Sequence, residues 1–242
     1  MPTAIVTGGG SGIGRATALR LSAMGYAVAL AGRTKDSLEK VAAEIAAAGG
    51  KSARKTLVIP TDVSKSADLE ALVKQAMAQW GQIDVLVNNA GMAPSVPLHE
   101  MSEAQWHAVL ETNLSSTFHA ARWVWPVMSR QRFGVIVNIS SMAAKDPFPG
   151  LGAYAVAKAG VNMLTLVMAR EGDAVGIRVV GIAPAGVDTP MFRSLVGEKN
   201  VNTSEILRPE DVAAAIAEVV DGGGGALRYA SGDTIYLHRR PA

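Results

Sequence analysis

Two residues in the C-terminal half have side chains and a spacing that suit acid–base chemistry. Tyr154 and Lys158 stand four residues apart in a helical pattern, so both side chains lie on one helix face. An unperturbed phenol has a pKa near 10, which is too high for efficient proton transfer at neutral pH. A lysine charge about 5 Å away, at an effective dielectric constant near 20, favours the phenolate by roughly 3 kcal/mol, or about two pKa units. We therefore expect Lys158 to lower the pKa of Tyr154, although such a pair alone is more often an ordinary feature of a helix.

Two further polar residues stand where they would assist this pair. Ser141 precedes Tyr154 by thirteen residues and comes just after the apolar run Val135–Ile139, so its hydroxyl is expected to donate to a substrate carbonyl oxygen. Asn113 lies within a predicted helix, where asparagine is a poor helix former. Asn113 either holds a water molecule that links Lys158 to solvent or is a buried residue satisfied by the backbone. Its spacing alone favours the second interpretation.

A glycine-rich turn near the N-terminus has the spacing of a phosphate-binding loop. The segment Thr7–Gly14 joins the first apolar run to the first helical stretch, and its glycines follow the pattern G-x-x-x-G-x-G. Such a turn exposes bare backbone to a pyrophosphate, and the helix N-terminus presents free N–H groups to it. A merely flexible loop is the alternative, but the position directly after the first strand favours a dinucleotide site.

The end of the second predicted strand indicates which dinucleotide is bound. A protein that binds NAD usually places Asp or Glu there, whereas this chain has Gly32 and Arg33. Because an arginine fork can clamp a 2′-phosphate, we expect NADP(H) to be preferred, with NAD(H) possible and a solvated surface arginine as the alternative role. Asp62 follows the third strand, where it either accepts from the adenine amino group or caps a turn.

These residues follow apolar runs that are typical of strands covered on both faces, rich in Val, Ile and Leu. The predicted strands are Thr3–Thr7, Ala27–Ala31, Leu57–Ile59, Val85–Val87, Val135–Ile139, Ile177–Ile182 and Thr234–Leu237. The predicted helices are Arg15–Met24, Asp36–Ala48, Ala67–Trp80, Ala104–Ser129, Tyr154–Arg170 and Glu210–Val220. The alternation predicts an α/β fold, a doubly wound seven-stranded parallel sheet of Rossmann type in three α/β/α layers, with ligands at the carboxyl ends of the strands.

Composition excludes several other classes of protein. The 242 residues are 49% hydrophobic and carry a net charge of +2, which excludes a disordered chain and argues against an electrostatic nucleic-acid binder. The absence of cysteine excludes disulfides, and the four histidines lack metal-ligand spacing, so no metal site is predicted. With no linker, repeat, signal peptide or membrane span recognised, we expect one domain over residues 1–242 in a cytoplasmic protein.

In combination, these motifs resemble those of the short-chain dehydrogenase/reductase family over essentially the whole chain. The matching motifs, in order, are Thr7-Gly8…Gly12-Ile13-Gly14, Asn88-Asn89-Ala90-Gly91, Asn113, Ser141 and Tyr154…Lys158. The resemblance implies an NAD(P)(H)-dependent oxidoreductase that interconverts a carbonyl and a secondary alcohol. It implies Tyr154 as general acid/base and Ser141 as the residue that orients the reacting oxygen. Lys158 would bind the nicotinamide ribose, and Asn113 would anchor a relay water.

The resemblance also implies a cofactor site and an oligomer. The residues expected at the cofactor are Thr7, Gly8, Ser11, Gly12, Ile13, Gly14, Arg33, Asp62, Val63, Asn89, Ala90, Gly91, Tyr154, Lys158, Pro184, Gly186, Val187 and Thr189. A homotetramer or homodimer is implied through the helices bearing Asn113 and Tyr154, with Trp123 and Trp125 either in that interface or in the core. The family usually has Pro-Gly after the sixth strand, so Ala185 is a departure expected to shift the backbone near the nicotinamide, and the C-terminal residues 237–242 depart from the family's usual ending as well.

The substrate is expected to be a small carbonyl or alcohol compound in a largely apolar pocket. The residues expected to contact it are Ser141, Met142, Phe148, Tyr154, Met191 and Phe192, under a lid at about residues 185–208. Sterol, acyl thioester, sugar and small ketone all remain open. The alternatives to a reductase are a cofactor-binding sensor without turnover, or a dehydratase or epimerase on the same fold.

Overall fold

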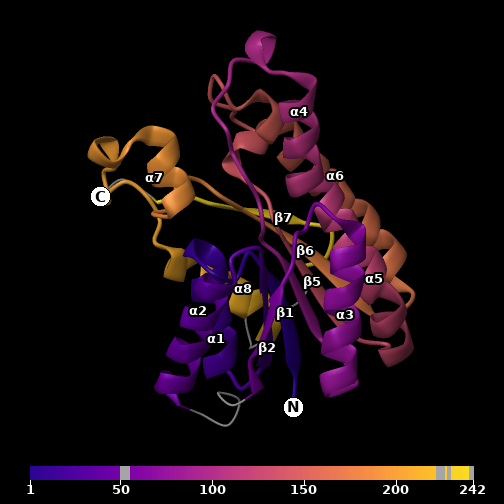
Figure 1. Ribbon diagram of the computed structural model, residues 1–242. Coiled ribbons are helices and arrows are strands. Elements are labelled where there is room, and N and C mark those ends of the chain that lie inside the picture. The colour runs from indigo at the N-terminus through magenta and orange to yellow at the C-terminus, as the bar shows by residue number, and fades with distance from the viewer. Residues whose placement is uncertain (50–54, 222–226, 228–229, 240–242) are drawn as a thin grey trace.

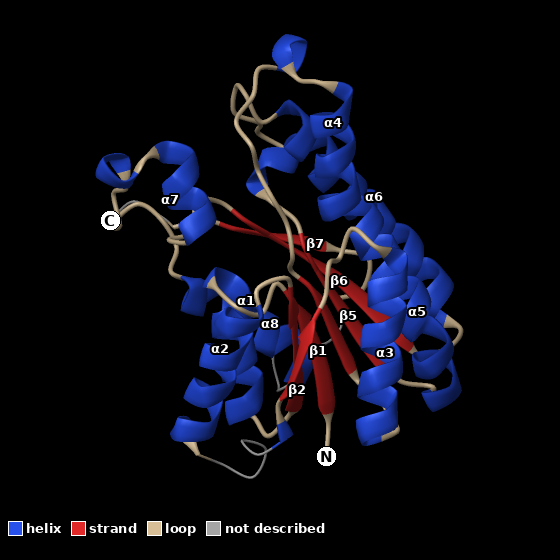
Figure 2. Cartoon of the chain, in the orientation of Figure 1, coloured by secondary structure: helices blue, strands red, loops and turns tan. Residues whose placement is uncertain are grey.

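The computed structural model describes residues 1–49, 55–221, 227 and 230–239. Its strands form one parallel sheet in the order β3-β2-β1-β4-β5-β6-β7 (Figure 2). They are β1 (Thr3–Thr7), β2 (Ala27–Gly32), β3 (Leu57–Pro60), β4 (Val85–Asn88), β5 (Gly134–Ile139), β6 (Ile177–Pro184) and β7 (Thr234–Leu237). The predicted doubly wound Rossmann-type sheet is confirmed, and the order reverses direction between β1 and β4.

Helices cover both faces of the sheet (Figure 1). On one face lie α1 (Gly12–Ala23), α2 (Lys35–Ala48) and α8 (Pro209–Asp221), and on the other lie α3 (Ser66–Trp80), α5 (Ser116–Gln131) and α6 (Gly152–Asp173). Each layer buries its apolar stripe against the strands, so the chain has one hydrophobic core on each side of the sheet. The two cores explain why β1 is buried at every position and shows no polar alternation.

The predicted helix Ala104–Ser129 is confirmed in its extent, but its central turn is not α-helical. Helix α4 (Glu103–Leu110) and helix α5 are separated by a π-helical turn, Glu111–Ser115, in which the Ser116 N–H donates to the Glu111 carbonyl five residues back. The cause is a set of side chains that bond to nearby carbonyls and compete with the α-helical ladder. These bonds run from Asn113 to Val109, from Ser116 to Thr112 and from Thr117 to Asn113.

The expected lid segment contains a helix that the sequence reading missed. Helix α7 (Pro190–Val196) begins after Thr189, whose hydroxyl accepts from the Phe192 N–H at 3.2 Å, and Pro190 fills its first turn. Threonine followed by proline is a standard helix start, so the signal was present in a short segment. The last three residues of the atypical C-terminal ending, 240–242, lie outside the described residues.

Helix α6 is long and apolar enough to cross a membrane by length and composition alone. In the fold it is a core helix that packs along β6, with Val161, Thr165 and Met168 buried. A buried lysine, Lys158, sits in its second turn. The helix is therefore part of the domain interior and not a membrane span.

Candidate active site

A cavity of about 300 Å³ opens beyond the carboxyl ends of β1, β4, β5 and β6, beside the point where the strand order reverses. Ligands of doubly wound sheets bind at this position. All of the predicted site residues line the cavity except Thr7, Gly14, Arg33, Asp62 and Val63. Two lining residues that the sequence reading did not single out are Ile139 and Leu151, apolar side chains whose positions depend on the fold.

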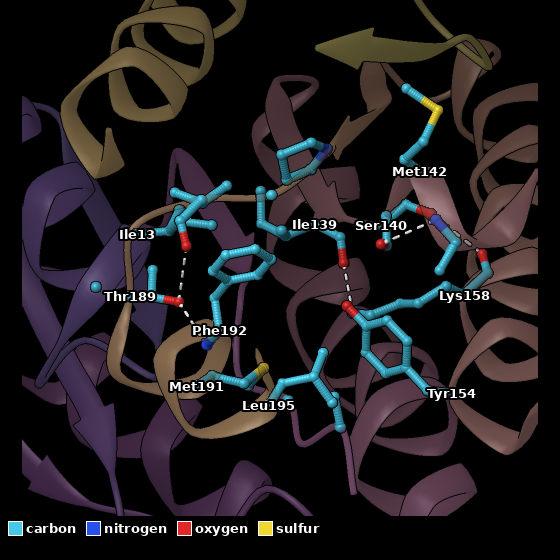
Figure 3. A pocket seen from close by; sticks show the side chains of 18 of the residues that line it. Ile13, Ile139, Ser140, Met142, Tyr154, Lys158, Thr189, Met191, Phe192 and Leu195 are labelled. Atoms are coloured by element: carbon cyan, nitrogen blue, oxygen red, sulfur yellow. Dashed lines mark hydrogen bonds between the residues drawn. The ribbon is translucent and has the colours of Figure 1, made fainter. Parts of the chain in front are cut away.

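The predicted catalytic residues meet on one side of this cavity. Tyr154 enters from the first turns of α6, and Ser141 comes from the loop after β5, where its hydroxyl accepts from the Ala143 N–H at 3.1 Å. The Ser141 hydroxyl also hydrogen-bonds the Tyr154 phenol. Figure 3 shows the Tyr154 ring and the Lys158 side chain reaching toward the same part of the cavity. A reacting carbonyl oxygen placed there has two hydroxyl groups within reach.

The expected lowering of the Tyr154 pKa by Lys158 is not found. Burial raises the pKa of Tyr154 above its ordinary value, and the hydrogen bond from Ser141 acts in the opposite direction but is the smaller effect. The Lys158 ammonium lies 5.6 Å from the centre of the Tyr154 ring and donates to the Ile139 carbonyl at 2.7 Å. At neutral pH, Tyr154 is therefore a phenol, which is the form that donates a proton.

Burial acts on Lys158 as well. It lowers the pKa of Lys158 to about 8, because the ammonium loses its hydration inside the protein. The side chain is only 4% exposed. Lys158 still carries its proton in most molecules at pH 7 and loses it in the mildly alkaline range.

Asn113 is held by the backbone on every side. Its amide donates to the carbonyls of Met92 and Val109, both at 2.9 Å, and its oxygen accepts from the Met92 N–H at 3.2 Å. A Cβ atom at Gly91 would lie 2.7 Å from that oxygen, so only glycine fits there. The amide N–H groups are both used, which favours the structural interpretation of this side chain over a water anchor.

The glycine loop between β1 and α1 forms a cradle of bare backbone. Gly8 and Gly12 have φ angles of +66° and +49°, which only glycine adopts without strain. A Cβ at Gly12 would lie 2.9 Å from Thr189 Cγ2, and one at Gly14 would lie 2.2 Å from the Gly8 carbonyl oxygen. This close approach of backbone at a helix N-terminus fits the pyrophosphate of a dinucleotide.

Thr7 shapes this loop from beneath and does not line the cavity. It is buried, and its hydroxyl oxygen accepts from the backbone N–H groups of Asn89 and Ala90. In the opposite direction, the Asn89 side-chain amide donates to the backbone carbonyls of Thr7 and Gly8. Thr7 therefore joins the ends of β1 and β4, and its predicted contact with the cofactor stays a prediction.

Arg33 and Asp62, the residues expected around the adenosine, lie outside the cavity, and Val63 beside Asp62 is buried. Arg33 is exposed, and its charge helps to lower the pKa of the Asp62 carboxyl. The main cause of that lowered pKa is the hydrogen bond from Ser64, whose N–H and hydroxyl both donate to Asp62 Oδ1. Asp62 therefore closes a turn after β3, which favours the second of its two expected roles.

Residues 2–200 match the family model for short chain dehydrogenases. The chain belongs to this family. This short-chain dehydrogenase is 35% identical to a 3-oxoacyl-[acyl-carrier-protein] reductase of Staphylococcus epidermidis (strain ATCC 35984), over 98% of this chain and 97% of that protein. It is 33% identical to an uncharacterized oxidoreductase of Staphylococcus aureus (strain MRSA252), over 88% of each chain.

Solved structures show the same likeness. The crystal structure of a levodione reductase superposes with a TM-score of 0.90 at 29% identity, covering 98% of this chain and 96% of that one. A 3-ketoacyl-(acyl-carrier-protein) reductase from Brucella melitensis complexed with NADH gives a TM-score of 0.84 at 28% identity, with the same coverage. This dehydrogenase is therefore an oxidoreductase that acts on CH–OH or C=O groups with a nicotinamide cofactor.

Ala185, in the place of the usual glycine of this family, is accommodated without strain. The described non-glycine residues include one with a positive φ, and it is Arg132. Ala185 lines the cavity, and its N–H donates to the Leu237 carbonyl at 2.8 Å. No group of three or more metal-ligating side chains occurs among the described residues of this dehydrogenase.

Proposed function

We propose that this chain is a cytoplasmic, NADP(H)-preferring carbonyl reductase in which Tyr154 is the general acid/base. The observation that carries the proposal is the half-buried, hydrogen-bonded pair of Tyr154 and Ser141 at the cavity wall. Ser141 orients the substrate oxygen, and Tyr154 donates the proton that the oxygen gains on reduction. The nicotinamide, when bound, supplies or accepts the hydride. At neutral pH the Tyr154 phenol is protonated, which is the form that a proton donor in carbonyl reduction must have.

The preference for NADP(H) rests on the end of β2. Gly32 places no carboxylate where a 2′-phosphate would lie. The guanidinium of the next residue, Arg33, is exposed and forms no hydrogen bond or ion pair with another described side chain. Such a group is available to a phosphate. The NADH in the Brucella melitensis structure belongs to a relative, and NAD(H) is the competing choice.

The substrate side of the cavity is apolar and is bordered by α7. Figure 3 shows Met191, Phe192 and Leu195 of this helix facing the cavity across from Tyr154, with Met142 on the far wall. Adaptable methionines and an aromatic ring suit a substrate with a sizeable apolar group. We assign residues 185–208 as the lid of a single domain that spans residues 1–242.

An exposed apolar stripe supports the oligomer. Val156, Met163 and Val167 lie on one face of α6 by their spacing, and Phe118 on α5 is exposed as well. Trp123 and Trp125 instead pack against the core of their own chain, and Trp123 Nε1 donates to Ser66 on α3 at 3.2 Å. The homodimer or homotetramer is therefore proposed to form through these exposed residues of α5 and α6 and not through the two tryptophans. Light scattering tests it, since a monomer at micromolar concentration would contradict it.

The test of the proposed function is isotope transfer with both cofactors. Purified protein is incubated with NADPH or NADH that carries deuterium at both C4 positions and with a panel of ketones, and the products are analysed by mass spectrometry. Deuterium on the former carbonyl carbon, with a higher kcat/KM for NADPH, is the expected result. A product without deuterium would indicate a dehydratase or epimerase, and binding of cofactor without turnover would indicate a sensor.

A further inference from the structure

One charged side chain other than Lys158 is among the described residues that line the cavity, and it is exposed to solvent at the mouth. Asp146 lines the cavity in the loop between β5 and α6, five residues after Ser141 and close in sequence to the exposed ring of Phe148. Its carboxylate has no hydrogen bond or ion pair to any side chain in the part of the chain that the structure describes. Unlike the catalytic residues, it has no assigned role.

The adjacent lysine does not neutralise this carboxylate. Lys145 stacks over Tyr236 of β7, with its ammonium 5.6 Å from the ring centre. Tyr236 is itself fixed, because its hydroxyl accepts from the Asn162 amide on α6 at 3.1 Å. The lysine is thus held at the edge strand and does not line the cavity.

The other charges near the substrate are already engaged. Lys158 is buried and donates to the Ile139 carbonyl. In the lid, Asp188 is bound by both its oxygens to Arg193, at 2.6 and 2.9 Å, and Arg193 also bonds Glu198 at 3.0 Å. Asp146 is therefore the unpaired charge among the described residues that line the cavity.

We propose that Asp146 is a specificity determinant, which makes this enzyme favour carbonyl substrates bearing an ammonium group over neutral ones, and neutral ones over carboxylates. The preferred class is amino ketones and the corresponding amino alcohols, with the ammonium directed toward the mouth and the apolar part along α7. The inference rests on the proposed function for the position of the carbonyl. Because the carboxylate is solvent-exposed, we expect about a fivefold step in selectivity, as for other exposed charge pairs.

Three ketones of equal length test the proposal. They are trimethyl(4-oxopentyl)ammonium, methyl 5-oxohexanoate and 5-oxohexanoate, which share an oxopentyl unit and differ in charge at its far end. Their kcat/KM values are measured with NADPH at low ionic strength and again in 1 M salt. The expected ranking of kcat/KM is cation, then ester, then anion. The differences should disappear in 1 M salt, because the Debye length falls to about 3 Å there.

Variants separate the charge from other effects. In Asp146→Asn the cation-to-anion ratio should fall toward one, and in Asp146→Lys it should invert. Glu171→Gln, an exposed acid on α6 outside the cavity, should keep the ratio of the parent enzyme. An unchanged ratio in Asp146→Asn, or a ranking that persists in 1 M salt, would overturn the proposal.

A binding measurement keeps this test independent of turnover. Dissociation constants of the three compounds from the NADPH-bound enzyme are obtained from the change in cofactor fluorescence. If the dissociation constants follow the same ranking but no alcohol product forms, the charge preference stands and the proposed reaction is refuted. Equal dissociation constants would refute the charge preference even if all three ketones were reduced.

Discussion

The two ends of the proposed cofactor site are built in different ways. At the proposed nicotinamide end, Lys158 is buried and donates to the Ile139 carbonyl, and the half-buried Tyr154 is hydrogen-bonded by Ser141. At the adenosine end, Arg33 is exposed and interacts with Asp62 only through its charge. Buried, fixed groups act at full electrostatic strength, whereas exposed ones are screened by water. The contrast predicts large effects of substitution at the first end and small ones at the second.

The largest effect is expected from Tyr154→Phe. Removal of the hydroxyl removes the proton donor, so kcat for ketone reduction should fall by about 10²–10⁴-fold. Cofactor affinity, followed by fluorescence titration, should change little, because the ring remains in place. A variant with near-normal kcat would show that the buried end does not contain the acid.

Gly14→Ala should have the next largest effect. The added methyl would lie 2.2 Å from the Gly8 carbonyl oxygen, so the loop must move. Overpacking of this kind costs about 1–3 kcal/mol, and we expect a lower melting temperature together with at least tenfold weaker cofactor binding. Gly152→Ala is the matched control, because its methyl would meet the flexible end of Leu98 at 3.3 Å. Similar losses in both variants would contradict a specific role of the loop.

Lys158→Met should stabilise the fold while reducing activity. Burial lowers the pKa of Lys158 from 10.5 to about 8, and at about 1.4 kcal/mol per pKa unit this corresponds to roughly 3 kcal/mol of destabilisation when the lysine is charged. Loss of the bond to Ile139 offsets about 1 kcal/mol of the gain, leaving about 2 kcal/mol at neutral pH.

The pH dependence gives this prediction its sign. Below pH 8 the lysine is protonated in both the folded and the unfolded state, so the full penalty for burying the ammonium is present. Between pH 8 and 10.5 the folded state has released the proton and the unfolded state has not, so the parent protein gains stability as pH rises. The advantage of the variant, measured by denaturant unfolding, should therefore be largest below pH 8 and shrink above it. A constant difference would refute the buried charge.

The smallest effect is expected from Arg33→Ala. The ratio of kcat/KM for NADPH to that for NADH should fall by about tenfold, the amount that a charge-assisted contact of about 1.4 kcal/mol contributes. Activity with NADH should stay the same, which distinguishes lost phosphate binding from general damage. An unchanged ratio would mean that the exposed end does not select the cofactor.

The strands, and the meeting of Ser141 with Tyr154 and Lys158 at one cavity, were predictable because their signals are local. Runs of valine and isoleucine buried on both faces mark the strands, and Ser141 is recognised by its place after β5. The hydrogen bonds by which Thr7 links β1 to β4 were not predictable, because a buried threonine and a cofactor-binding threonine look alike in sequence. The raised pKa of Tyr154 depends on burial and on where the Lys158 ammonium points, and neither is a property of spacing.

The π-helical turn Glu111–Ser115 fixes the angular phase between α4 and α5. An α-helix advances about 100° and 1.5 Å per residue, and a π turn holds one residue more than an α-helical turn. Deleting a single residue there would turn α4, the π turn and α5 into one regular α-helix. It would also rotate α4 by about 100° relative to α5. The Asn113 amide would then turn away from the Met92 backbone that it bonds on both sides. The number of residues in this short segment therefore sets the orientation of α4 relative to α5. Substitutions within the segment should be better tolerated than the deletion of any one residue.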